Sequence, residues 1–231
     1  MMGVAPFITE DEKMTYTPTG DIVLPAPSRA MHHISLSSPT NFSGQFIAGD
    51  GAGRVVLTNS HLELNWGLVL LARKETVDIS EQVEFFWVND EGKSHPHYFD
   101  FVVLQSDKQR IAYAVRPMAR SFGSFRETMP MIAKQARASR RYSDVRHLSE
   151  KDLDPIELSN AWLFHGMRTP DPEADILAAD VLAEMTGIVT LGELADRVHQ
   201  GPWGLRAMIR LIRSHHLRLV RPELINSTTE V

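Results

Sequence analysis

The sequence contains no cysteine. This excludes disulfide bonds, thiolate zinc sites and cysteine nucleophiles. Long apolar runs are also missing, since the stretch Gly67–Ala72 falls far short of the ~20 residues that a membrane-spanning helix needs. The first residues carry acids where a signal peptide has basic charge and a long apolar stretch. We therefore expect a cytoplasmic protein with no membrane association.

The composition is that of an ordinary globular protein, with 231 residues, 43% of them hydrophobic and 23% charged. The net charge of −5 hides a strong asymmetry. Residues 107–151 hold eleven Lys/Arg and four Asp/Glu, so the rest of the chain carries a balance of −12. Such segregation favours a phosphate-binding surface on an otherwise acidic protein. The alternative is a basic helix face that is merely solvated.

Pro, Gly and turn-forming residues divide the chain into segments. The start is rich in proline and has no helical period. Two further stretches, Asp152–Pro155 and Arg168–Pro172, resemble linkers. We expect an N-terminal arm at 1–30, a first domain at 31–150, a linker at 151–175 and a second domain at 176–231.

The first domain shows alternating helix and strand patterns. Asn59 or Ser60 can cap a helix whose apolar residues recur at helical spacing. A second helix is expected at about 125–141, although Pro130 could instead mark its first residue. Between the two helices, three runs have strand character: Val83–Val88, Tyr98–Leu104 and Arg110–Val115. This order predicts an α/β fold with a mixed sheet and flanking helices.

The second domain has a different pattern. A helix is expected at Ile176–Met185, and another at Leu191–Val198, where Thr190 and Glu193 form a capping box. After Gly201-Pro202 we expect a third helix, Trp203–Ser214, and then a short extended run, Leu217–Val220. Helices joined by a tight turn and followed by a strand are typical of a winged helix-turn-helix domain.

Three arginines of the expected third helix, Arg206, Arg210 and Arg213, are spaced to share one face. On a recognition helix they would reach phosphates or guanine edges of DNA. The alternatives are a solvated face or a surface that binds an acidic protein partner.

Candidate catalytic carboxylates occur in the first domain. Glu63 lies on the expected first helix and Asp100 on the second strand. Metal-dependent nucleases hold magnesium with two or three carboxylates gathered at a sheet edge. His95 and His97 flank Asp100, but no third ligand stands at metal-binding spacing.

The stretch from Gly44 to Pro117 is similar to the N-terminal domain of TnsA-type transposon endonucleases, which have a PD-(D/E)xK nuclease fold. Four short segments carry this resemblance: Ser60-His61-Leu62-Glu63 at the helix start, Glu81-Gln82-Val83 at the position of Glu-Gln-Pro, Gly92-Lys93 in a hairpin, and Phe99-Asp100 in the position of Pro-Asp. Ala114-Val115-Arg116-Pro117 falls on the family's Glu-Val-Lys-Pro position, and Asn59 replaces an acid. The family also carries a C-terminal winged-helix domain.

The resemblance implies that Glu63 and Asp100 bind magnesium. It places Ala114 at the position of the third acid and Arg116 at the position of the lysine. Alanine cannot ligate a metal, and arginine is a poor proton-transfer group. The catalytic motif is therefore expected to be impaired unless Glu127 replaces the acid and Lys93 or Lys108 replaces the lysine.

These observations predict a double-stranded-DNA-binding protein that acts in transposition, in another form of recombination or in transcriptional control. A transposase or ATPase subunit and a second copy of the chain are candidate partners. One alternative is an active magnesium-dependent endonuclease that nicks transposon ends, and another is an assembly adaptor that binds protein. The residues expected to contact DNA are Arg116, Arg120, Lys134, Arg137, Arg140, Arg141, Arg206, Arg210 and Arg213.

Overall fold

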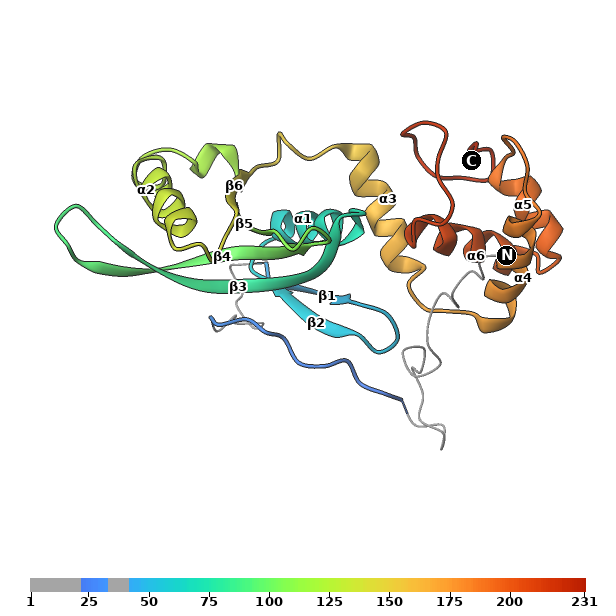
Figure 1. Cartoon of the computed structure of the whole chain (residues 1–231), viewed down its shortest axis with the longest axis horizontal. Coiled ribbons are helices and arrows are strands. Elements are labelled where there is room, and N and C mark those ends of the chain that lie inside the picture. The colour runs from blue at the N-terminus through green and yellow to red at the C-terminus, as the bar shows by residue number, and fades with distance from the viewer. Residues whose placement is uncertain (1–21, 33–41) are drawn as a thin grey trace. The chain divides into compact units, whose positions relative to one another are not determined.

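The structure is a computed structural model that describes residues 22–32 and 42–231 (Figure 1). Residues 1–21 of the expected N-terminal arm lie outside the described part. The chain divides into two compact units, one formed by residues 26–48 and 54–158 and the other including residues 49–53 and 159–231. In the described part of the chain, no helix is long and apolar enough to cross a membrane.

A four-stranded mixed sheet forms the centre of the first unit. Its strands run in the order β3 (Thr76–Val88), β4 (Ser94–Gln105), β5 (Arg110–Val115) and β6 (Asp144–Leu148). The first three are antiparallel, and β6 pairs parallel to β5. The predicted α/β class is confirmed. The sequence patterns identified β5 with its observed bounds but gave β3 and β4 too short and missed β6.

Two helices flank this sheet. Helix α1 (His61–Ala72) precedes β3 and is capped by the side chain of Ser60, one of the two cap residues that the sequence allows. After β5, a short 3-10 helix, η2 (Met118–Arg120), leads into α2 (Ser124–Ala138) and then into β6. The alternative that α2 begins at Pro130 is wrong, because Pro130 lies inside the helix. The ring of Pro130 is exposed. The burial of apolar neighbours on α2 offsets the cost of the hydrogen bond that proline cannot donate.

The sheet is covered on both faces. All residues from Ile111 to Val115 in β5 are buried, although their side chains alternate between the two faces. Met129 and Ile132 of α2 pack in one apolar cluster with Phe85 of β3 and Ala112 of β5. These contacts fix the position of α2 (Figure 1) and leave its basic residues exposed on the side away from the sheet.

A hairpin that the sequence patterns do not predict packs beside α1. It consists of β1 (Gly44–Ala48) and β2 (Arg54–Thr58). The helix approaches it so closely that a Cβ atom on Gly67 would lie 2.6 Å from the ring of Phe46 and 3.0 Å from that of Phe101. Only glycine fits at this contact without displacing a ring.

The range 151–175, expected to be a linker, contains helix α3 (Pro155–Gly166) and the start of α4 (Pro172–Ala183). Asp154 begins α3, because its carboxylate accepts hydrogen bonds from the backbone N–H groups of Ile156 and Glu157. Pro155 stands at the first helical position, where its missing N–H costs nothing. The proline therefore starts a helix instead of marking a linker.

The second unit is built around three helices, α4, α5 (Leu191–Val198) and α6 (Pro202–Arg213). The predicted capping box of Thr190 and Glu193 is present at the start of α5. Apolar side chains from all three helices form one core. The expected strand Leu217–Val220 is not formed in the described residues; Val220 N–H donates to the Glu230 carbonyl, and Pro222 limits further pairing. A β wing is therefore not seen.

Candidate functional site

The first carboxylate of the candidate site, that of Glu63, lies in the first turn of helix α1. The Oε2 atom of Glu63 accepts a hydrogen bond of 2.8 Å from the Asn59 backbone N–H, and Oε1 accepts one of 2.9 Å from the Ser60 hydroxyl. The Ser60 hydroxyl in turn accepts the Glu63 backbone N–H. This reciprocal cap fixes the buried carboxylate at the helix N-terminus, where the helix dipole favours its charge.

The second carboxylate lies in the middle of the sheet. Asp100 of β4 is partly buried and stands one residue before the Phe101–Tyr113 pair of β4 and β5. Its Oδ2 atom accepts a 2.7 Å hydrogen bond from the backbone N–H of Val115. The carboxylate is therefore held next to the end of β5, where the resemblance places the third acid and the lysine.

Gln82 of β3 joins the two carboxylates. Its Nε2 atom lies 3.3 Å from Oε2 of Glu63 and 3.2 Å from Oδ1 of Asp100, and donates to both. The residue is buried and has a φ of 48°, a left-handed conformation that is uncommon outside glycine. In the sequence, Gln82 is notable only as part of the segment Glu81-Gln82-Val83. A left-handed residue inside a strand leaves no sequence signal, so the bridge could not be predicted.

The environment of this cluster disfavours two negative charges. Burial, followed by the neighbouring charge of Glu63, raises the pKa of Asp100 to about 7, although the hydrogen bonds from Val115 and Gln82 act in the opposite direction. Burial also raises the pKa of Glu63. A shared proton or a bound cation would relieve the repulsion between the two carboxylates.

The positions of the third acid and the lysine carry no comparable groups. Ala114 is buried and packs in the apolar cluster under α2. Arg116 is exposed; its Nε donates a 2.5 Å hydrogen bond to the Arg120 carbonyl, and its guanidinium lies 4.8 Å from the ring centre of Phe125. Within the described residues, Arg116 makes no hydrogen bond to either carboxylate.

The replacement groups considered from the sequence lie on exposed surfaces. Glu127 is exposed on α2, Lys93 in the β3–β4 turn, and Lys108 in the β4–β5 turn. His97 packs on the ring of Phe99, and burial lowers its pKa to about 4. Among residues 22–32 and 42–231, no group of three or more His, Asp or Glu is placed to hold a metal ion. The site therefore offers two carboxylates and one carboxamide.

A basic surface covers η2, the exposed side of α2 and the loop after it. Its exposed cations make few contacts with other side chains. Arg137 forms an ion pair of 3.6 Å with Asp144, and the guanidinium of Arg141 lies 5.7 Å from the ring centre of Tyr142. We use the name basic surface for six exposed residues: Arg116, Arg120, Lys134, Arg137, Arg140 and Arg141.

The three arginines of α6 do not form the exposed face that their spacing predicts. Arg210 is only 9% exposed and forms a 2.6 Å ion pair with Asp175 of α4. Arg213 pairs with Asp50 at 2.8 Å, and Arg206 lies over the ring of Trp203. Spacing along one helix could not reveal the acid on α4 that draws Arg210 into the core. Two of the three cations are thus already paired within the protein.

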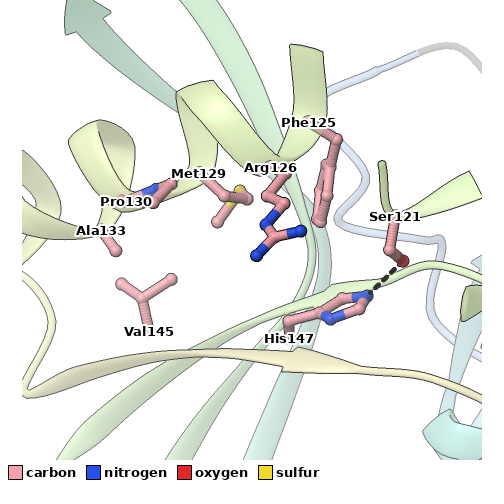
Figure 2. A pocket seen from close by; sticks show the side chains of 8 residues that line it. All are labelled: Ser121, Phe125, Arg126, Met129, Pro130, Ala133, Val145 and His147. Carbon is pink, nitrogen blue, oxygen red and sulfur yellow. Dashed lines mark hydrogen bonds between the residues drawn. The ribbon is translucent and has the colours of Figure 1, made fainter. Parts of the chain in front are cut away.

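An open pocket of about 280 Å³ lies between α2 and β6 (Figure 2). Met129 and Ala133 of α2 face Val145 and His147 of β6 across it. Arg126 extends toward the pocket from the first turns of α2. The pocket adjoins the basic surface, because Phe125 lines it and also contacts Arg116.

No protein-family model matches this chain, and no curated protein sequence matches it either.

Proposed function

We propose that this protein binds double-stranded DNA through the basic surface, on a nuclease-like core whose catalytic centre is incomplete. The observation that carries the proposal is the exposed arginine-rich surface of η2, α2 and the following loop, on a unit whose carboxylate site has no third acid among the described residues. Arginine and lysine side chains bind DNA phosphates without regard to sequence.

The arrangement of the first unit supports the nuclease-like part of the proposal. The order α1, β3, β4, β5, α2, β6 places Glu63 on a helix and Asp100 on the middle strand of a meander. This agrees with the TnsA-type resemblance, which implies metal-binding carboxylates at these two positions. Helices α5 and α6, joined by residues 199–201, also fit a helix-turn-helix. A role in recombination or transcriptional control would follow from such DNA binding.

Ala114 is the main reason to propose binding without cleavage. Its methyl group supplies no ligand, and Arg116 is held by the Arg120 carbonyl and Phe125. An arginine in place of the lysine can neutralise a phosphate, but it stays protonated and cannot take a proton from water. Loss of both groups removes most of the positioning and charge stabilisation on which phosphodiester cleavage depends.

The experiment that tests DNA binding compares wild-type protein with a variant of the basic surface, Lys134→Ala/Arg137→Ala/Arg141→Ala. A control with the same loss of charge elsewhere is Lys74→Ala/Arg218→Ala/Arg221→Ala, whose three side chains are exposed. We expect the first variant to lose at least tenfold in affinity for a labelled duplex at low salt, and the control to stay within about twofold. Equal losses in both variants would contradict an interface on α2.

A second candidate function is a magnesium-dependent endonuclease, and one observation favours it. Glu63 and Asp100 are brought to the same Gln82 amide, and oxygen ligands of this kind suit magnesium. Rotation of the carboxamide would offer Oε1 of Gln82 as a further ligand. When bound, magnesium would stabilise charge at a phosphate oxygen. This function predicts nicking of duplex DNA that disappears in Asp100→Ala; a nicking rate that Asp100→Ala leaves unchanged would remove it.

A further inference from the structure

The pocket between α2 and β6 combines apolar walls with a cation. Met129, Pro130 and Ala133 form the helix wall, and Val145 lies opposite on the strand (Figure 2). The guanidinium of Arg126 has neither a hydrogen bond nor an ion pair among the described residues, and it extends toward the opening (Figure 2). Such a site suits a ligand with an apolar, flat body and a negative charge beside it.

The polar end of the pocket is built for binding and not for nucleophilic attack. Ser121 Oγ lies 3.1 Å from His147 Nε2, a pairing that resembles a serine–histidine dyad. The Ser121 hydroxyl, however, donates to the Pro117 carbonyl at 2.9 Å, and the same His147 nitrogen lies 3.2 Å from the Arg116 carbonyl. With its proton held by a backbone oxygen, the serine is not activated by the histidine.

The charge around the pocket selects among ligands. Phe125, which lines the pocket, contacts the guanidinium of Arg116, and Lys134 is exposed on the next turn of α2 after Pro130. A surface of net positive charge favours a polyanion that extends beyond the pocket over a neutral ligand. Among polyanions, a nucleic acid also supplies flat apolar rings next to its negative charges.

We propose that the pocket holds the base of an unpaired nucleotide in the DNA that lies on the basic surface. The base enters between the helix wall and Val145, and Arg126 binds the phosphate of the same nucleotide. This inference rests on the proposed function, and it specifies the substrate as duplex DNA that carries a bulge or an unpaired end. An unpaired base has no partner in the opposite strand, so its entry does not cost the energy of breaking a base pair.

The test uses the full chain and two fluorescein-labelled duplexes that differ only in one unpaired adenine. Fluorescence anisotropy measures both dissociation constants. We expect wild-type protein to bind the bulged duplex about fivefold more tightly than the paired duplex. Contacts between one base and protein side chains raise the affinity for single-stranded DNA by at least this factor. Ala133→Leu fills the pocket and removes this preference while leaving affinity for the paired duplex within about twofold. Ala138→Leu, an exposed site on the same helix, keeps the preference.

A second pair of variants keeps the test decisive if Ala133→Leu does not fold. Arg126→Ala changes an exposed side chain and should lower affinity mainly for the bulged duplex. Lys134→Ala should weaken binding of both duplexes equally. If wild-type protein binds both duplexes alike, or Arg126→Ala retains the full preference, the pocket does not hold a base and only duplex binding stands. If neither duplex is bound at low salt, the proposed function itself fails.

Discussion

Three side chains from three elements, Glu63, Gln82 and Asp100, set the chemistry of the candidate site. The sequence supplied both carboxylates, because each stands in a recognisable helix or strand pattern. The role of Gln82 could not be predicted from the sequence. Its two hydrogen bonds form only when β3 packs against α1 and pairs with β4, and its backbone is left-handed. Nor could it show that Arg210 is buried, since its partner Asp175 lies on another helix.

The raised pKa of Asp100 makes stability depend on pH. Its folded pKa of about 7 lies above its usual 3.8, so the carboxyl group stabilises the fold most below pH ~4, and this contribution is lost as the pH rises through 7. We expect Asp100→Asn, measured by urea unfolding at pH 5 and pH 8, to lose less free energy of unfolding over this interval than wild-type protein. An equal decrease in both proteins would contradict the assigned environment.

The two carboxylates and one carboxamide of the cluster predict what a third carboxylate would do to stability and to metal binding. Gln82→Glu places three carboxyl groups where a carboxamide now bridges two, and it should lower the free energy of unfolding at pH 8 by about 1–3 kcal/mol. Manganese should reverse this loss, so that the melting temperature of Gln82→Glu rises more with Mn²⁺ than that of wild-type protein. Gln45→Glu, on the exposed side of β1, is the matched control and should show neither effect. A Gln82→Glu variant insensitive to Mn²⁺ would show that the three side chains are not close enough to share a cation.

At the scale of elements, the sequence predicted what local signals determine. Helix α5 and its capping box, the Ser60 cap of α1 and the bounds of β5 all follow from short-range patterns. The missed elements depend on distant partners. Strand β6 forms by pairing with β5, from which α2 separates it, and the β1–β2 hairpin is buried by α1.

The contact between α1 and the hairpin predicts a position where even a methyl group is excluded. Gly67→Ala should lower the free energy of unfolding by about 1–3 kcal/mol, because its Cβ would meet the rings of Phe46 and Phe101. Gly166→Ala is the matched control: nothing lies within 4 Å of its Cβ position, and the exchange should be neutral or slightly stabilising. Urea unfolding of both variants measures the difference. Equal stability of the two would mean that α1 does not approach the hairpin this closely.

At the scale of the whole molecule, charge is separated between a basic segment and an acidic remainder. The basic residues of 107–151 are exposed, and most of them lie on or beside η2, α2 and the following loop, while Arg210 and Arg213 of α6 form internal ion pairs. If the protein binds DNA as proposed, this distribution favours phosphate contacts by the first unit. Net charge alone, at −5, would have suggested no affinity for DNA.

Such binding should be governed by released counterions. The logarithm of the affinity should fall linearly with the logarithm of salt concentration. The slope should be shallower by roughly 3 in Lys134→Ala/Arg137→Ala/Arg141→Ala, because each lost phosphate contact removes about 0.9. Anisotropy titrations over a series of salt concentrations measure both slopes. Parallel slopes would mean that these three side chains do not contact phosphates.

DNA binding without cleavage is tested most directly by one reaction that is analysed on two gels. Full-length protein is incubated with a labelled duplex at low salt in the presence of Mn²⁺, and the products are run on a native gel and on a denaturing gel. DNA binding without cleavage would give a shifted complex on the native gel and intact strands on the denaturing gel. Cut strands that disappear in Asp100→Ala would contradict the incomplete catalytic centre, and the absence of a shifted complex would contradict DNA binding itself.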